Sequence, residues 1–362
     1  MRTQALRWMT WGLALAVSTG MLAAQQSRAT SGRGGFGSLD QAAVGGERGS
    51  SVTGPTLGYV VDASTGNLHM VSGIAGSSTM GAPVHRGSAI QSSAIAPSAA
   101  YAVVSDESGK AWFYGQPGPR GASGAELADL SGVTHLATSP SGDGFVAFAA
   151  ASGRISMYAI RDGSPHLERS FSVSLSAPVA RIALADGLKD PTILTRDASG
   201  TSLLRAGDGG VRSVAVLPGA TEVAFFRGSE RAAILDASQN AVYEADLALQ
   251  NPALALVASS AQGIDAPVGL ALSDDNRTIA VASAVTRKAT LIDMATRSAT
   301  QLDLPEAPTG VRRMNSRAVF QLTDASSGPM LLLDVQGDSA RTVYVPLYQG
   351  ERGASGGRAS LQ

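Results

Sequence analysis

The sequence predicts an all-β fold, a seven-bladed β-propeller with four antiparallel strands in each blade. The first observation is a turn motif between two short apolar runs that recurs about every 44 residues. The second is that the chain after residue 24 has no sustained apolar stripe of helical period. Its apolar runs are instead short and rich in Val, Ile, Ala, Tyr and Phe, which favours strands. Four-stranded units at this spacing are typical of propeller blades.

The recurring turn has the pattern Asp-Ala-Ser-Gly or a variant of it. Aspartate accepts hydrogen bonds from the amides that follow, and glycine or asparagine adopts the left-handed conformation that closes a hairpin. One further turn upstream and one downstream divide each copy into four strands. The first copy is the weakest, because its inner strand must come from about Ser50–Thr53 or be borrowed from elsewhere. The seven copies are anchored at positions 62, 106, 150, 197, 236, 283 and 324.

The N-terminus predicts export. Arg2 and Arg7 precede an apolar stretch that runs from Trp8 to Ala24. A basic start, an apolar middle and small residues at the exit are typical of a secretory signal peptide. We therefore expect residues 1–24 to be removed and the mature protein to be periplasmic or extracellular. An uncleaved membrane anchor is the alternative, but the stretch lies at the lower limit of length for a transmembrane helix.

Both ends of the mature chain are predicted to be flexible. Residues 25–50 and 350–362 are rich in glycine and serine and contain few apolar residues. Such segments cannot bury enough apolar surface to offset the entropy that is lost on ordering. The propeller is therefore assigned to residues 51–349. No membrane span is expected after removal of the signal peptide, because no later apolar run is long enough.

The composition excludes several classes of function. The absence of cysteine excludes disulfides, thiolate metal sites and a cysteine nucleophile. Lys+Arg is 28 and Asp+Glu is 29, so no overall charge favours binding to nucleic acid. No metal or cofactor is expected, since the histidines lack ligand spacing and no phosphate-binding loop follows a strand. The four histidines are His69, His85, His135 and His166.

Several copies share a motif of an apolar inner strand followed by a polar turn. The segments Leu136–Gly142 and Ala266–Asn276 show it, and Ile279–Ala282 continues the second. These segments resemble the repeats of YVTN-type (WD-like) seven-bladed propellers. The resemblance is architectural and implies an exported protein that binds partners or ligands at a face of the ring; some related propellers are lactonases or dehydrogenases. The tryptophan–aspartate signature of WD repeats is missing.

One set of inner-strand residues is predicted to converge near one mouth of the central channel. Arg181 and Arg312 could bind a carboxylate or phosphate, because guanidinium pairs bidentately with both. Glu222 and His135 could form a general acid–base pair. The alternative is that these groups only solvate the channel or pair with one another. Alignment of the inner strands on the turns that follow them superposes Ser92, His135, Arg181, Glu222 and Gly269, with Arg312 or Arg313 from the last copy.

The predicted function is that of an exported, non-enzymatic binding or protein-interaction module. Its partner would be a protein or a small anionic ligand at the channel face. The reason is that the sequence contains no nucleophile constellation, metal cluster or cofactor motif. The main alternative is a lactonase-type propeller hydrolase that uses the polar residues of the channel mouth, and a structural protein of the cell envelope is a third class.

Overall fold

The computed structural model describes residues 55–85, 87–116, 124–326, 328–337 and 339–348. The chain divides into two units, Met1–Ser51 and Val52–Gln362. The first unit lies outside the described residues. The predicted signal peptide at 1–24, the segment at 25–50 and the tail at 350–362 therefore also lie outside them.

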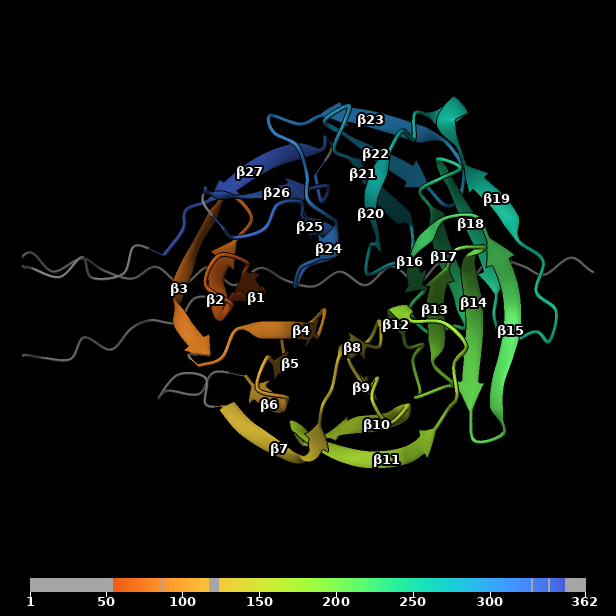
Figure 1. The fold of residues 1–362 in the computed structure, drawn as a ribbon. Helices are drawn as coiled ribbons and strands as arrows, with labels where there is room; N and C mark the ends of the chain where they lie inside the picture. The colour runs from red at the N-terminus through yellow and green to blue at the C-terminus, as the bar shows by residue number, and fades with distance from the viewer. Residues whose placement is uncertain (1–54, 86, 117–123, 327, 338, 349–362) are drawn as a thin grey trace, which may run out of the picture. The chain divides into compact units, whose positions relative to one another are not determined.

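The second unit forms seven antiparallel sheets, or blades, around a ring (Figure 1). Blade 1 contains β1 (Thr56–Asp62), β2 (Asn67–Ile74) and β3 (Ser77–His85), and blade 2 contains β4 (Ile90–Ile95), β5 (Tyr101–Asp106), β6 (Lys110–Gly115) and β7 (Gly124–Ser131). Blade 3 contains β8 (His135–Thr138), β9 (Gly144–Ala149), β10 (Arg154–Arg161) and β11 (Ser164–Ser172). Blade 4 contains β12 (Val179–Ala183), β13 (Thr192–Asp197), β14 (Gly200–Gly207) and β15 (Gly210–Leu217).

The remaining blades follow the same order. Blade 5 contains β16 (Ala220–Phe225), β17 (Arg231–Asp236), β18 (Ala241–Asp246) and β19 (Ala255–Ala258), and a short 3₁₀ helix (Ser260–Gln262) follows it. Blade 6 contains β20 (Pro267–Leu272), β21 (Thr278–Ser283), β22 (Lys288–Asp293) and β23 (Ala299–Asp303). Blade 7 contains β24 (Arg312–Arg313), β25 (Val319–Gln321), β26 (Met330–Asp334) and β27 (Arg341–Val345).

The prediction of a seven-bladed propeller is confirmed. Six blades have four strands, and blade 1 has three among the described residues. Residues 50–53, which were expected to supply its inner strand, lie outside those residues. The first strands of blades 2 to 7 lie innermost, and each contacts the next around the channel. Within the described part of the chain, no helix has the length and apolarity needed to cross a bilayer.

The predicted chemistry of the recurring turn is also observed. The Oδ1 atoms of Asp62, Asp106, Asp197 and Asp236 accept hydrogen bonds from the amide two residues ahead at 2.7–3.0 Å. In blade 3 the turn closes through Gly153, whose φ is +64°. A Cβ atom at that position would lie 2.1 Å from the carbonyl oxygen of Val173. Glycine is therefore required there by both conformation and space.

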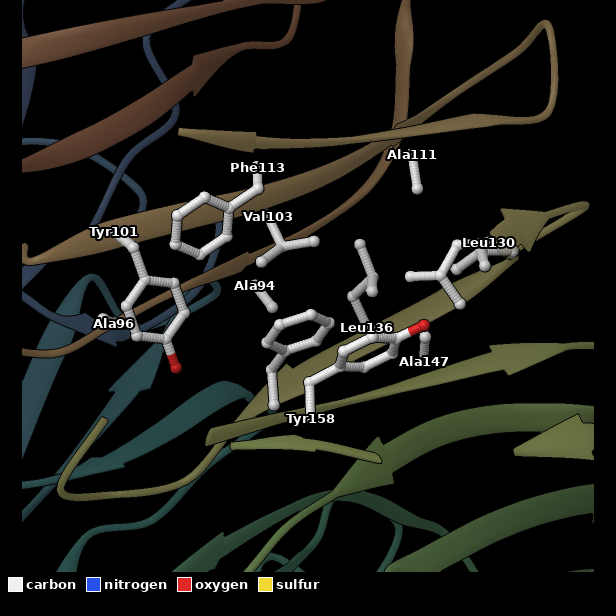
Figure 2. Packing of buried hydrophobic residues seen from close by; sticks show 12 residues of the cluster. Ala94, Ala96, Tyr101, Val103, Ala111, Phe113, Leu130, Leu136, Ala147 and Tyr158 are labelled. Atoms are coloured by element: carbon white, nitrogen blue, oxygen red, sulfur yellow. The ribbon is translucent and has the colours of Figure 1, made fainter. Parts of the chain in front are cut away.

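The core lies between neighbouring blades, so no blade buries its faces alone. Figure 2 shows the cluster between blades 2 and 3, where side chains from both sheets meet. Phe145 is fully buried and stacks on Tyr158 with ring centroids 4.7 Å apart. The hydroxyl of Tyr101 donates to the carbonyl oxygen of Gly144 at 2.9 Å. Apolar burial and a directional bond together hold the two sheets side by side.

The ring closes where blade 7 meets β1. The amide of Asn315 donates to the carbonyl oxygen of Leu57 at 2.7 Å, and its side chain donates to that of Thr56 at 2.8 Å. Arg312 donates to the carbonyl oxygen of Tyr59 at 2.9 Å. The side chains of Asn315 and Arg312 and the amide of Asn315 thus donate hydrogen bonds to carbonyl groups of β1 that do not face β2.

Candidate functional site

A cavity of about 520 Å³ occupies the central channel. The inner strands β4, β8, β12, β16, β20 and β24 line it, together with Val61 of β1. Apolar and small residues form most of its wall, so the few charged groups dominate its electrostatics. The charged residues that line it are Arg181, Glu222, Arg312, Arg313 and Asp324.

Three of the predicted site residues lie close together near the beginnings of consecutive inner strands. His135 is on β8, Arg181 on β12 and Glu222 on β16. Nη2 of Arg181 is 2.6 Å from Oε2 of Glu222. Nδ1 of His135 is 2.9 Å from the hydroxyl of Thr134, in the same end of the channel. We call the end of the cavity lined by Arg181 and Glu222, with His135 at the start of the neighbouring β8, the channel mouth.

The two titratable groups of the channel mouth have shifted pKa values. Burial lowers the pKa of His135, the charge of Arg181 lowers it further, and a hydrogen bond with the backbone of Val179 opposes both. Burial raises the pKa of the Glu222 carboxyl, although the Arg181 guanidinium opposes this shift. Neutral pH therefore leaves His135 uncharged.

Arg181 retains unused hydrogen-bond donors. Its side chain is 52% exposed, and only Nη2 makes a hydrogen bond or ion pair with another described residue. A guanidinium carries five N–H groups in a planar fork. The bond to Glu222 therefore fixes the orientation of the guanidinium plane. The donors on Nε and Nη1 have no partner among the described residues, so a ligand can bind to them.

Two other aligned positions serve the packing of the blades. The Oγ atom of Ser92 accepts a hydrogen bond from the amide of Leu136 at 3.1 Å, which joins blades 2 and 3. A Cβ atom at Gly269 would lie 2.6 Å from the amide nitrogen of Val311. Blade 7 approaches blade 6 closely at this glycine, and neither residue offers a group for ligand chemistry.

Arg312 lies deeper in the channel than His135. The amide of Met314 closes the turn after β24 as the amide of Ser139 closes the turn after β8. Four residues before these turns lie Gly310 and His135, respectively. Gly310 thus has the position equivalent to His135, and Arg312 follows two residues later.

Arg312 is engaged by the ring itself. It donates to the carbonyl oxygen of Tyr59 at 2.9 Å and to the side-chain oxygen of Gln321. Burial lowers the pKa of Arg312 to about 10, and the charge of Asp324 opposes the shift. Arg312 contributes positive charge to the channel wall, but its contacts hold it at the junction of blades 7 and 1.

Arg313 crosses the channel at the end opposite the channel mouth. Its Nη2 donates to the carbonyl oxygen of Pro140 at 2.8 Å, and its Nη1 is 3.3 Å from Oδ1 of Asp274. Pro140 follows β8, whereas His135 begins it, so the two residues mark opposite ends of the strand. At about 3.3 Å per residue, the ends of this four-residue strand are about 10 Å apart. Arg313 therefore bridges blades 7, 6 and 3 at the far end of the cavity.

Several lining residues were not identified from the sequence. Asp324 was assigned only as a turn anchor, Val268 only as part of an inner-strand motif, and Gln321 and Thr323 carried no signal. These residues line the channel because the ring closes around it, and no local pattern in the sequence marks them as lining residues. Among the described residues, no group of three His, Asp or Glu side chains is close enough to hold a metal ion.

Comparisons with known proteins agree with the architecture. No protein-family model matches the chain, and no curated protein sequence matches it. A periplasmic gluconolactonase of Pseudomonas aeruginosa is 14% identical, with a TM-score of 0.55, over 81% of this chain and 97% of that one. A candidate 6-phosphogluconolactonase of Bacteroides fragilis is 11% identical, with a TM-score of 0.56, over 82% and 97%.

A protein from Lactobacillus plantarum has a similar fold, with 12% identity and a TM-score of 0.55 over 80% of this chain and 96% of that one. At these identities the similarity concerns the fold alone. The resemblance to seven-bladed propellers that the sequence suggested is thus confirmed as an architectural one.

Proposed function

We propose that this chain is an exported, non-enzymatic propeller that binds a small anionic ligand at the channel mouth. The observation that carries the proposal is the half-exposed guanidinium of Arg181, oriented by Glu222 and with donors to spare. Such a fork matches a carboxylate or a phosphate. Because Glu222 holds the guanidinium in place, less side-chain entropy is lost when a ligand binds.

The surroundings support binding rather than chemistry. Glu222 is the counter-ion of Arg181, and Arg181 contributes to keeping His135 uncharged. The Glu222 carboxylate is thus paired with the guanidinium of Arg181, and the charge of Arg181 acts on the imidazole of His135. Within the described residues, no hydrogen bond joins Glu222 to His135. A ligand would enter at the channel mouth, since Arg313 bridges the far end.

Export is the part of the proposal that rests on residues 1–24. The basic, apolar and small-residue regions in that order support a cleaved signal peptide. Expression of the full chain, cell fractionation and N-terminal sequencing test it. A mature N-terminus near Gln25 in the exported fraction is expected, and a full-length protein retained in the cell would contradict it.

Calorimetry tests the binding site. The full chain is titrated with gluconate, glucuronate, butanoate and inorganic phosphate, and the Arg181→Ala variant should lose the binding seen for wild type. Arg161→Ala is the matched control, since Arg161 is an exposed arginine paired with Glu168 on an outer strand. No binding of any of these anions, or equal binding by wild type and Arg181→Ala, would rule out the proposed site.

A lactonase-type hydrolase is the second candidate function. It is favoured by a neutral imidazole and a carboxyl group in one channel mouth, and by the two structurally similar proteins described as lactonases. His135 would act as the general base in such a reaction. Hydrolysis of glucono-δ-lactone above the uncatalysed rate, lost in His135→Asn, would support this candidate over the binding module.

A further inference from the structure

An apolar groove of about 440 Å³ lies between blades 3 and 4. Buried Phe148 and Val173 form its floor. Its walls are the turn at 150–153 and the segment at 175–179, which leads from β11 to β12. The groove is lined by apolar residues, glycine and two serines, with no charged side chain. Apolar side chains beside a polar site offer a place for the apolar part of a ligand.

The groove adjoins the channel mouth along β12, because Val179 lies in its wall and Arg181 lines the central cavity. In the floor, Phe148 packs against the imidazole of His135, with ring centroids 6.0 Å apart. Arg181 follows Val179 by two residues on β12. Their Cα atoms are therefore about 7 Å apart. One small molecule can reach both the guanidinium and the apolar wall.

This continuity identifies the class of ligand, and the inference rests on the proposed function. We propose that the ligand is an amphiphilic carboxylate, with its carboxylate on Arg181 and its alkyl or aryl group in the groove between blades 3 and 4. The charged end is matched by the spare donors of Arg181. The apolar end removes the surface of Leu175, Pro178 and Val179 from water. A polyhydroxylated sugar acid would leave that surface unmatched.

Chain length provides the test. Calorimetric titration of the full chain with butanoate, hexanoate and octanoate should show affinity rising about fourfold per methylene, which corresponds to about 0.8 kcal/mol. Gluconate should bind no better than butanoate. Arg181→Ala should weaken the binding of all three acids, and octanol should bind more weakly than octanoate.

A groove-filling variant locates the apolar end. Ala150 is exposed in the wall, so Ala150→Trp fills the groove without removing core packing. It should abolish the gain with chain length, so that octanoate binds no more tightly than butanoate. Ala63→Trp is the matched control, because Ala63 is exposed in the corresponding turn of blade 1 and does not line this groove.

The outcomes separate this inference from the proposed function. Arg181-dependent binding with the same affinity for every chain length would overturn the groove and leave the anion site standing. A chain-length gain that persists in Ala150→Trp would also overturn it. Binding of octanol as tight as that of octanoate would overturn the role of the carboxylate. The absence of binding by any carboxylate would overturn this inference, and the proposed function would fall with it if inorganic phosphate also failed to bind.

Discussion

The substitution Phe145→Ala tests whether packing between blades stabilises the ring. Phe145 is fully buried between blades 2 and 3 and stacks on Tyr158 at 4.7 Å with nearly parallel rings. It also contacts Tyr101, at 6.3 Å between ring centroids. Truncation of a buried phenylalanine costs about 3–5 kcal/mol. The two aromatic contacts place this site in the upper half of that range, at about 4–5 kcal/mol.

Urea unfolding measures this loss. Trp112 is the only tryptophan after residue 24, and it packs in the cluster between blades 1 and 2, so its fluorescence reports on unfolding at the neighbouring interface of blade 2. Circular dichroism of the strands provides a second probe, and coincident transitions would justify a two-state free energy. The matched control is Leu167→Ala on β11, because Leu167 is 51% exposed. It should change stability by less than about 0.5 kcal/mol.

The reasoning would be refuted by a small or non-specific effect. A loss below about 1 kcal/mol for Phe145→Ala would mean that the interface relaxes around the cavity. An equal loss for Leu167→Ala would mean that packing between blades is not what was measured. Separate fluorescence and dichroism transitions would show instead that the blades unfold as independent units.

Three further predictions concern turns and charges. Gly153→Ala should destabilise the protein by more than about 1 kcal/mol in the same urea assay, because a Cβ atom would strike the Val173 carbonyl and φ is +64°. Burial alone would raise the pKa of Asp106, but hydrogen bonds from Ser108, Trp112 and the Lys110 amide outweigh it and lower the pKa. The contribution of the Asp106 carboxylate to stability is therefore present above pH 3.8 and lost as the pH falls through the lower pKa of the folded state. Asp106→Asn should be less stable than wild type at pH 7 and should lose less stability on acidification to pH 3. Equal losses of stability on acidification in the two proteins would contradict this. Arg181→Ala should raise the pKa of His135 in an NMR titration, since burial and the Arg181 charge lower it; an unchanged titration would show that the two groups do not interact.

The sequence predicts the blades well because their signals are local. The hydrogen bond from the amide of Ser64 to Asp62 involves only residues of the turn itself, so the motif can be recognised in the sequence without knowledge of the ring. The same regularity places His135, Arg181 and Glu222 at one depth, because they have corresponding positions in the repeat, on β8, β12 and β16. A repeat therefore predicts both architecture and the height of a residue along the channel.

The remaining features depend on contacts between distant segments. The last copy has a two-residue inner strand and an irregular turn, so the sequence alone could not show that Gly310 rather than Arg312 matches His135. The apolar groove depends on how residues 175–179 cross between blades, and no periodic pattern marks that crossing. The bonds from Asn315 to β1 join residues more than 250 positions apart.

The bridge made by Arg313 has a mechanical consequence. A closed circle of sheets can flatten into an ellipse by small rotations at each junction, with little cost at any one of them. A side chain that joins blade 7 to Pro140 of blade 3 acts as a strut across the diameter and resists that flattening. The bridge therefore couples the two sides of the circle at the end of the channel opposite Arg181.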